Sequence, residues 1–275
     1  MQKIKIAVGT NIFGECERQS LGIKSLLKCK DKFKDKIDLF NLQFENGRDL
    51  KEVDGFKTLQ CLKRTSKNDI KGDKHLPMVK EMFDSLAALG YDYFCFINSD
   101  IIVSYKFFDE IFSEENTAYI GSRLAIEGDI TDINFNITIN DPTSPVRNSH
   151  YQVSGFDAFT IKTDWWNENR KLFPDYVYAV VYWDTHYATI FLKNTKTRMQ
   201  NKSPTLFHII HEDKSSARIK EFFHNENIFY NLYREDFNRW HNYFFNILVK
   251  RPGLNFVTPH SNELELQQIY FTVQK

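Results

Sequence analysis

The spacing of apolar side chains changes twice within the first 50 residues. Residues 4–8 form a short apolar run, and residues 18–30 repeat Leu and Ile at intervals of three to five residues. Residues 36–44 then alternate apolar and polar positions. Alternation at period two is typical of a strand and the longer period of an amphipathic helix, so the pattern predicts a strand, a helix and a second strand.

A second helix and a buried strand are predicted between residues 75 and 103. Residues 75–89 place apolar side chains on one face, with Pro77 near the start and Gly90 after the end, as is common in helices. Residues 91–103 are almost continuously apolar, with one polar interruption at Asn98-Ser99-Asp100. Continuous apolarity is typical of a strand covered on both faces of a parallel sheet.

The rest of the pattern completes an α/β fold with a C-terminal addition. A helix is predicted over residues 105–112, and strands over residues 118–126, 135–139 and 155–162. This alternation indicates a mixed, mainly parallel sheet flanked by helices. Beyond Arg218, aromatic residues recur at helical spacing as far as Arg251-Pro252-Gly253, which predicts a long amphipathic helix. We therefore expect a sheet domain over residues 1–215 and a helical extension over residues 216–275.

Composition excludes several classes of protein. The chain has 275 residues, 42% hydrophobic and 15% aromatic, with 11 Gly and 7 Pro, which is the composition of an ordered globular protein. Its 36 basic and 36 acidic side chains balance, which removes the electrostatic case for nucleic acid as a partner. The four cysteines form no C-x-x-C pair, and no apolar run reaches the ~18 residues of a membrane span. We expect free thiols and a cytoplasmic protein.

Asp100 stands at the carboxyl end of the predicted central strand, beside the polar side chains of Asn98 and Ser99. One interpretation is that it caps the helix that follows. The other starts from the rule that open α/β sheets bind ligands beyond the carboxyl ends of their strands. A carboxylate there is suited to a hard divalent cation, which in turn would bind a substrate diphosphate.

Two later segments combine acids with residues that could line a sugar site. Gly155 and Asp157 begin an apolar strand, and Asp184 follows the aromatic plane of Trp183. An aromatic ring packs on the C–H face of a sugar, while a carboxylate accepts hydrogen bonds from hydroxyls or removes a proton from one. The alternative is that Trp183 belongs to the core and Asp184 merely to the helix that follows.

Two histidines, His208 and His211, lie at the end of a short apolar strand. Residues three apart on a strand face opposite ways, so we expect at most one of them to reach a site on a given face. A single histidine with satisfied hydrogen bonds is usually structural.

In their order, these pieces resemble the nucleotide-sugar-dependent glycosyltransferases of the GT-A fold, over residues 4–216. The matching pieces are Gly9-Thr10-Asn11 after the first strand, the helix at 18–27, the segments 96–102 and 155–159, Trp183-Asp184, and His208 to His211. That family often carries an Asp-x-Asp motif whose last Asp binds a metal ion. Here Asp100 matches the last Asp, and Asn98 replaces the first.

The resemblance implies a role for each matching residue. Asp100 would bind Mn²⁺ or Mg²⁺ on a nucleoside-diphosphate sugar together with a late histidine, His211 ahead of His208. Gly9, Thr10 and Asn11 would lie against the nucleobase or ribose, Asn98 and Ser99 would border the donor, and Gly155 and Trp183 would border the acceptor. Asp184 would be the general base of an inverting transfer, with Asp157 as the next candidate. The acceptor would be a saccharide or a glycolipid.

Charge is unevenly distributed along the chain. Residues 24–74 contain 14 basic and 9 acidic side chains, whereas residues 81–141 contain 2 basic and 12 acidic ones. A basic flank could attract a diphosphate and an acidic middle a cation, although solvated surface charge explains most such runs. Arg64 would contact the donor if its loop folds over the edge of the sheet.

The sequence leaves two questions open, namely whether the chain is an enzyme and what its C-terminal helix packs against. The chain could be a non-catalytic nucleotide-sugar or carbohydrate-binding module of the same fold, in which Asn98 marks lost metal chemistry. The C-terminal helix could pack on the sheet domain, on a second copy in a homodimer, or on a membrane surface that holds a lipid-linked acceptor, although its acidic residues dilute the cationic face of such helices.

Overall fold

A computed structural model describes residues 4–13, 17–46, 51–126, 150–200, 205–209, 219–243 and 257–258. Its strands are β1 (Ile6–Thr10), β2 (Ile37–Phe44), β3 (Lys57–Leu62), β4 (Tyr93–Ile97), β5 (Ile102–Val103), β6 (Ala118–Ile126), β7 (His150–Lys162), β8 (Thr197–Gln200), β9 (Leu206–Ile209) and β10 (Val257–Thr258). Its helices are α1 (Glu17–Phe33), α2 (Ser66–Ile70), α3 (Val79–Ala87), α4 (Tyr105–Ser113), α5 (Thr163–Asn169), α6 (Trp183–Asn194) and α7 (Ile219–Tyr243), with short 3-10 turns η1 (Lys34–Lys36) and η3 (Arg170–Leu172).

The described strands form one mixed sheet in the order β10-β8-β6-β7-β4-β1-β2-β3, with β5 and β9 pairing beside it. Strands β3, β2, β1 and β4 are parallel to one another. Strand β7 is antiparallel to both β4 and β6, so β4 and β6 run in the same direction. The predicted α/β class with a mixed sheet is confirmed, and the carboxyl ends of β1 to β4 and of β6 lie at one edge.

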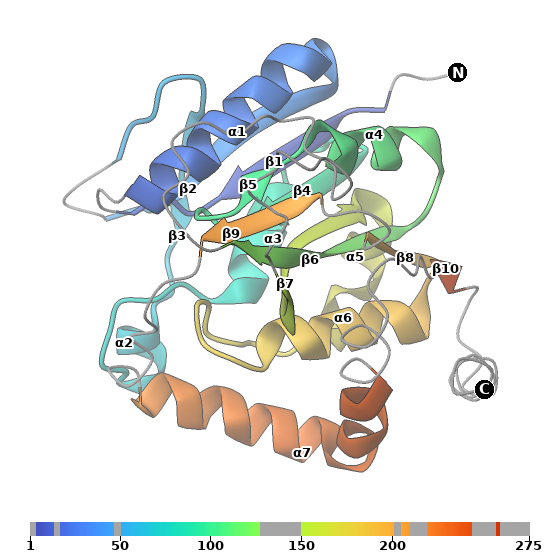
Figure 1. Cartoon of the computed structure of the whole chain (residues 1–275). Helices are drawn as coiled ribbons and strands as arrows, with labels where there is room; N and C mark the ends of the chain where they lie inside the picture. The colour runs from blue at the N-terminus through green and yellow to red at the C-terminus, as the bar shows by residue number, and fades with distance from the viewer. Residues whose placement is uncertain are drawn as a thin grey trace.

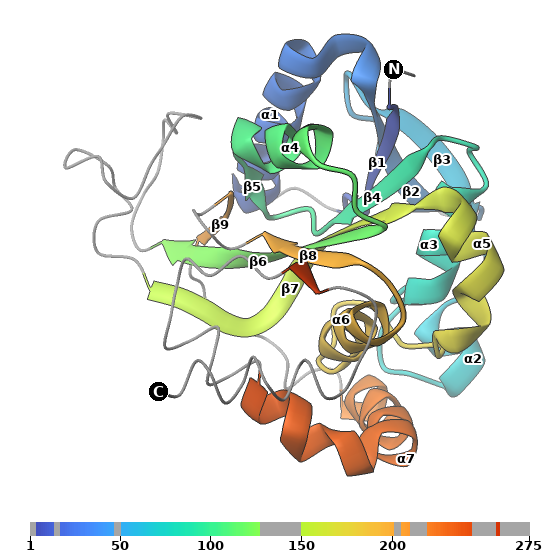
Figure 2. The ribbon, with the colours of Figure 1, turned by 90° about the vertical axis from the view of Figure 1, so that its right-hand side faces the viewer.

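Helices cover both faces of the sheet. Helices α1 and α4 lie on one face and α3, α5 and α6 on the other, while α7 lies outside α6 (Figure 1, Figure 2). The core on the α3 side is largely aromatic, with the ring of Phe83 at 5.3 to 5.9 Å from those of Phe94, Phe96, Phe159 and Trp166. Aromatic rings therefore fill much of the space between the sheet and these helices.

Several segments differ from the sequence prediction. The strand predicted over 91–103 is divided into β4 and β5, and α2, α5 and β8 were not expected. Strand β3 was not expected, because it lies at the end of the strand order and its side chains are mostly exposed or half-buried, which leaves no clear apolar pattern. Helix α3 begins at Val79, four residues later than predicted, since Pro77 and Met78 form extended bridges with Thr65 and Val177. The predicted strand at 135–139 lies outside the described residues.

The end of helix α3 agrees with the prediction, since Gly90 has a φ of +72°, which favours glycine. Cys29, Cys61 and Cys95 are free thiols, as expected. Within the described ranges, no helix has both the length and the apolar character needed to cross a membrane.

Candidate functional site

The turn after β4 carries Asn98, Ser99 and Asp100 to the carboxyl edge of the sheet. The Asn98 N–H donates to the carbonyl oxygen of Asp157 at 3.0 Å, and the Ile101 N–H donates to the carbonyl oxygen of Asn98 at 3.1 Å. These two bonds continue the pairing of β4 with β7 and then close the turn. Asn98 and Asp157 are therefore neighbours because of the register of the sheet.

Helix α1 supports this turn from the other side. Nε2 of Gln19 donates to the Ser99 hydroxyl at 2.8 Å. A Cβ atom at Gly22 would stand 2.4 Å from the carbonyl oxygen of Ser99, so the close approach of helix and turn requires glycine. The Ser99 hydroxyl is thus directed toward α1, and not toward a nucleoside-diphosphate sugar as expected.

A hydrogen-bonded chain of four side chains crosses the edge of the sheet. Oδ1 of Asp157 accepts from Nδ2 of Asn98 at 2.7 Å and from Nη1 of Arg123 at 2.5 Å. The Tyr178 hydroxyl donates to Oδ1 of Asn98 at 3.1 Å. Asp157 is 2% exposed, and its Oδ2 has no hydrogen-bond partner among the described residues. A buried carboxylate oxygen without a partner needs an explanation, and a bound ion, water or ligand is one.

Arg123 is the common neighbour of three acids. Burial opposes its charge, but Asp157, Asp100 and Asp184 act together to raise the pKa of Arg123 above its ordinary value. Three carboxylates and one guanidinium leave the cluster net negative when all are ionised. Such a cluster favours an additional cation.

Asp100 is paired with the histidine that the sequence analysis placed second. Nε2 of His208 lies 3.2 Å from Oδ2 of Asp100. Burial alone would raise the pKa of Asp100, but the hydrogen bond to His208 and the charge of Arg123 outweigh it, so the pKa is lowered. Asp100 is therefore held as a carboxylate beside an imidazole nitrogen.

Asp184 lies in the first turn of α6, where its Oδ2 accepts a hydrogen bond from the Phe156 N–H at 2.9 Å. Burial, with a smaller contribution from the nearby Asp157, raises the pKa of Asp184 to about 6 against the opposing effect of that hydrogen bond. A carboxyl group with a pKa near neutrality is suited to proton transfer. Gly155, the predicted acceptor contact, directly precedes Phe156 in β7.

The residue before α6 has a strained backbone. Tyr182 has φ +84° and ψ −37°, a conformation that favours glycine. A strained residue persists only where surrounding contacts fix it, and such residues concentrate at functional sites. Here the strain lies two residues before Asp184.

Trp183 does not present its ring to the edge of the sheet. It is 4% exposed, and its ring lies 5.4 Å from that of Phe159 and 6.2 Å from that of Phe96. Trp183 is therefore a core residue, which was the alternative interpretation of the sequence. A sugar could not stack on a ring packed in this way.

The end of β1 is also occupied by contacts within the fold. A Cβ atom at Gly9 would meet Leu86 of α3 at 2.4 Å, and Thr10 is 1% exposed. Nδ2 of Asn11 donates to the carbonyl oxygen of Leu42 at 2.6 Å. Gly9, Thr10 and Asn11 lie at the expected edge, but Leu86 fills the space beside Gly9, and the side chains of Thr10 and Asn11 are buried.

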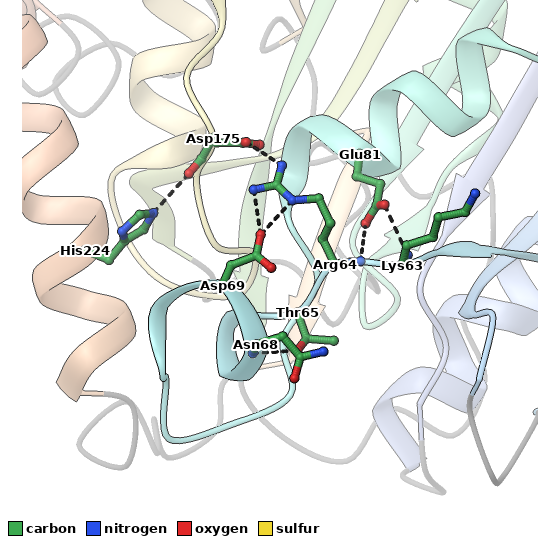
Figure 3. Close-up of polar contacts among 8 residues, drawn as sticks. All are labelled: Lys63, Arg64, Thr65, Asn68, Asp69, Glu81, Asp175 and His224. Atoms are coloured by element: carbon green, nitrogen blue, oxygen red, sulfur yellow. Dashed lines mark hydrogen bonds and ion pairs between the residues drawn. The ribbon is translucent and has the colours of Figure 1, made fainter.

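Arg64 follows β3 at the same edge and bridges two carboxylates (Figure 3). Its Nη1 lies 2.5 Å from Oδ2 of Asp175, and its Nε and Nη2 each lie 2.6 Å from Oδ2 of Asp69. The Thr65 side chain caps α2 beside it. Arg64 therefore joins α2 to the segment before α6, and in this arrangement its charge is already paired.

Tyr178 and Arg123, which belong to the hydrogen-bonded chain with Asn98 and Asp157, were not predicted from the sequence. Tyr178 carries no local signal, because it lies in an irregular segment. Arg123 has a weak one, since it is one of two basic residues in the acidic stretch 81–141. His211, the preferred metal ligand, lies outside the described residues.

The side chains at the site supply some of the ligands that the predicted cation would need. The carboxylate of Asp100 is a ligand type that both Mn²⁺ and Mg²⁺ take in proteins, whereas the imidazole of His208 suits a transition metal such as Mn²⁺ better than Mg²⁺. Nε2 of His208 and Oδ2 of Asp100 are adjacent. No group of three His, Cys, Asp or Glu side chains in the described part of the chain is arranged to hold a metal. The described residues would therefore supply two ligands, and a substrate diphosphate could supply others.

Comparison with known proteins gives no family for the chain. No protein-family model matches the sequence, and no curated protein is significantly similar to it.

Proposed function

We propose that the chain is a glycosyltransferase that moves a sugar from a nucleoside-diphosphate donor to an acceptor hydroxyl. The observation that carries the proposal is the convergence of Asp100, Asp157 and Asp184 on Arg123. Asp100 follows the carboxyl end of β4, and Asp157 of β7 is bonded to Asn98 at that same end. Open α/β sheets bind ligands at this edge. An acid suited to a cation and an acid with a raised pKa are the two groups that such a transfer needs.

Asp184 is the general base in this proposal. Its pKa of about 6 leaves it mostly ionised at neutral pH, while making it a better proton acceptor than an ordinary carboxylate. The acceptor oxygen forms a bond to the anomeric carbon as the bond from that carbon to the diphosphate oxygen breaks. The electron pair leaves with the diphosphate, the acceptor proton passes to Asp184, and the anomeric configuration inverts.

Asp100 and His208 hold the cation in this proposal, with His211 as a further candidate. When bound, Mn²⁺ or Mg²⁺ would neutralise charge on the departing diphosphate. Asn98 and Arg123 fix Asp157 beside this position through the hydrogen bonds described above. The acceptor class that we propose is a saccharide or a glycolipid, as in polysaccharide or glycoconjugate synthesis.

The first experiment is a turnover screen of UDP-, GDP- and dTDP-sugars with Mn²⁺, with and without a chelator. In an Asp100→Ala variant, metal-dependent turnover should fall at least 10²-fold, because the cation loses a charged ligand. The matched control is Asp109→Ala, which removes an exposed acid of α4 that is paired with Lys32. Full turnover in Asp100→Ala, or in the presence of chelator, would show that the assignment is wrong.

A non-catalytic nucleotide-sugar-binding module is the second candidate. It is favoured by Asn98, which replaces the first acid of the Asp-x-Asp motif and is hydrogen-bonded to Asp157 and Tyr178. The two candidates differ in the release of nucleoside diphosphate from a bound donor without an acceptor. A transferase hydrolyses its donor slowly under these conditions, whereas a binding module leaves it intact.

A further inference from the structure

The segment 174–182 links two parts of the site. Tyr178 in this segment donates to Asn98, and the segment leads directly into α6 and Asp184. On one side it pairs with residues 77–79: the Val79 N–H donates to the carbonyl oxygen of Tyr176 and the Tyr178 N–H to that of Pro77, each at 2.9 Å. The N–H and the carbonyl oxygen of Val177 therefore point to the other side.

Asn225 of α7 occupies that other side. Its Oδ1 accepts from the Val177 N–H at 2.9 Å, and its Nδ2 donates to the carbonyl oxygens of Val177 at 3.0 Å and Val181 at 3.1 Å. Asn225 is 0% exposed. One side-chain amide thus takes the place of a neighbouring strand, with both a donor and an acceptor in use.

Helix α7 also holds both ends of the segment. Nε2 of His224 donates to the carbonyl oxygen of Asp175 at 3.1 Å, and the Asp175 carboxylate binds Arg64 (Figure 3). At the other end, the ring of Tyr182 lies 4.7 Å from that of Phe229 and 5.7 Å from that of Phe222. These ring contacts anchor the side chain of Tyr182, whose backbone is strained.

We infer that helix α7 is a brace that holds segment 174–182 in the conformation that positions Tyr178 and Asp184, with Asn225 as its central positioning residue. The role of Asn225 at the site rests on the proposed function, whereas its effect on the segment does not. An aspartate at this position would have the same size, but it would lack the amide donor and would place a negative charge against two carbonyl oxygens.

The test compares Asn225→Asp with wild type by hydrogen exchange and by kinetics. Backbone amides of residues 175–182 should exchange at least about tenfold faster in the variant, because the bonds that order them are lost. In the transfer assay, kcat should fall about tenfold or more, while the donor KM changes less than about threefold, since misplaced catalytic groups slow the chemical step. Asn227→Asp is the matched control, because Asn227 lies exposed on the same helix.

Each outcome decides one of the two claims. Unchanged exchange in Asn225→Asp overturns the brace, and faster exchange with unchanged kcat overturns its role at the site. If wild type transfers no sugar from any donor, the proposed function fails and exchange alone decides the brace. If Asn225→Asp does not fold, His224→Ala, which removes a single hydrogen bond to the segment, is measured by the same criteria.

Discussion

Asp184 is a residue whose ionised form the fold disfavours. Its pKa in the folded protein is about 6, above the ordinary value of 3.8 that applies to the unfolded chain. Between these values Asp184 binds its proton in the folded state and loses it in the unfolded state, so its contribution to the free energy of unfolding falls as pH rises from about 4 to about 6 and is then constant. Ionised Asp184 therefore lowers stability at neutral pH.

The Asp184→Asn variant should separate stability from activity. Asn keeps an oxygen that can accept from the Phe156 N–H, and it carries no charge to bury, so the free energy of unfolding at pH 7 should rise by about 1–3 kcal/mol. Turnover should fall by 10² or more, because the general base is lost. Urea unfolding at pH 4 and pH 7, together with the transfer assay, measures both effects. Transfer at the wild-type rate would remove Asp184 from the mechanism.

Arg123 offers a second test at this scale. Its removal in Arg123→Ala leaves the buried carboxylate of Asp157 without its cationic partner, which should lower the free energy of unfolding by roughly 3 kcal/mol. Adding Asp157→Asn should recover part of that loss, since the uncompensated charge is then absent. Chemical denaturation of the two single variants and the double variant checks the prediction. Strict additivity of the two single effects would show that the pair does not interact.

The sequence predicts the acids of the site better than their partners. Asp100 and Asp184 were identifiable because each stands beside an apolar run or an aromatic residue in a recognisable order. Arg123 was not, since its partner Asp157 is 34 residues away and the two meet only through the pairing of β6 with β7. Trp183 was assigned to the site although it lies in the core, because a buried ring and a sugar-stacking ring look the same in sequence.

At the scale of elements, the contact of α1 with the turn after β4 leaves no room for a side chain at Gly22. Gly22→Ala should displace the turn 99–101 and destabilise the protein by about 1–3 kcal/mol, because the new methyl group would lie 2.4 Å from a backbone oxygen. Thermal unfolding measures the loss, and Lys24→Ala, at an exposed position of α1, is the control. An unchanged melting temperature would show that α1 can move away without cost.

Elements with a strong apolar period agree with the structure, and those defined by distant contacts do not. Helix α1 and strands β1 and β2 begin and end close to the predicted residues, whereas the strand predicted over 91–103 is divided into β4 and β5 by the turn after Ile97. Strand β3 was missed because most of its side chains are exposed or half-buried, so it shows no clear apolar period. The start of α3 was misplaced because residues 76–78 bond to Ser66 and to segment 176–178, which local sequence does not reveal.

At the scale of the whole molecule, the cysteines report on the integrity of the core. Burial raises the pKa of Cys29 and of Cys95 to about 12, and both lie in the core between the sheet and helices α1 and α4. Cys61 is half-buried. Of these three thiols, a thiol reagent at neutral pH should therefore modify Cys61 first, and Cys29 and Cys95 only as the protein unfolds.

Mass spectrometry of peptides labelled over time, in buffer and in urea, checks this order. Labelling of Cys95 in buffer at the rate seen in urea would mean that the α1 side of the sheet opens readily without global unfolding.

The docking of α7 has a consequence for the order in which the protein is made. Glu221 accepts hydrogen bonds from Ser66 and from Lys74, partners 155 and 147 residues earlier in the chain. Chains are synthesised from the N-terminus and contacts of such long range form late. A nascent chain that has not yet reached Asn225 contains strands β1 to β9 but lacks the brace. The site is therefore completed only after α7 has been synthesised, and a ribosome that stalls before that point yields a chain without an ordered site.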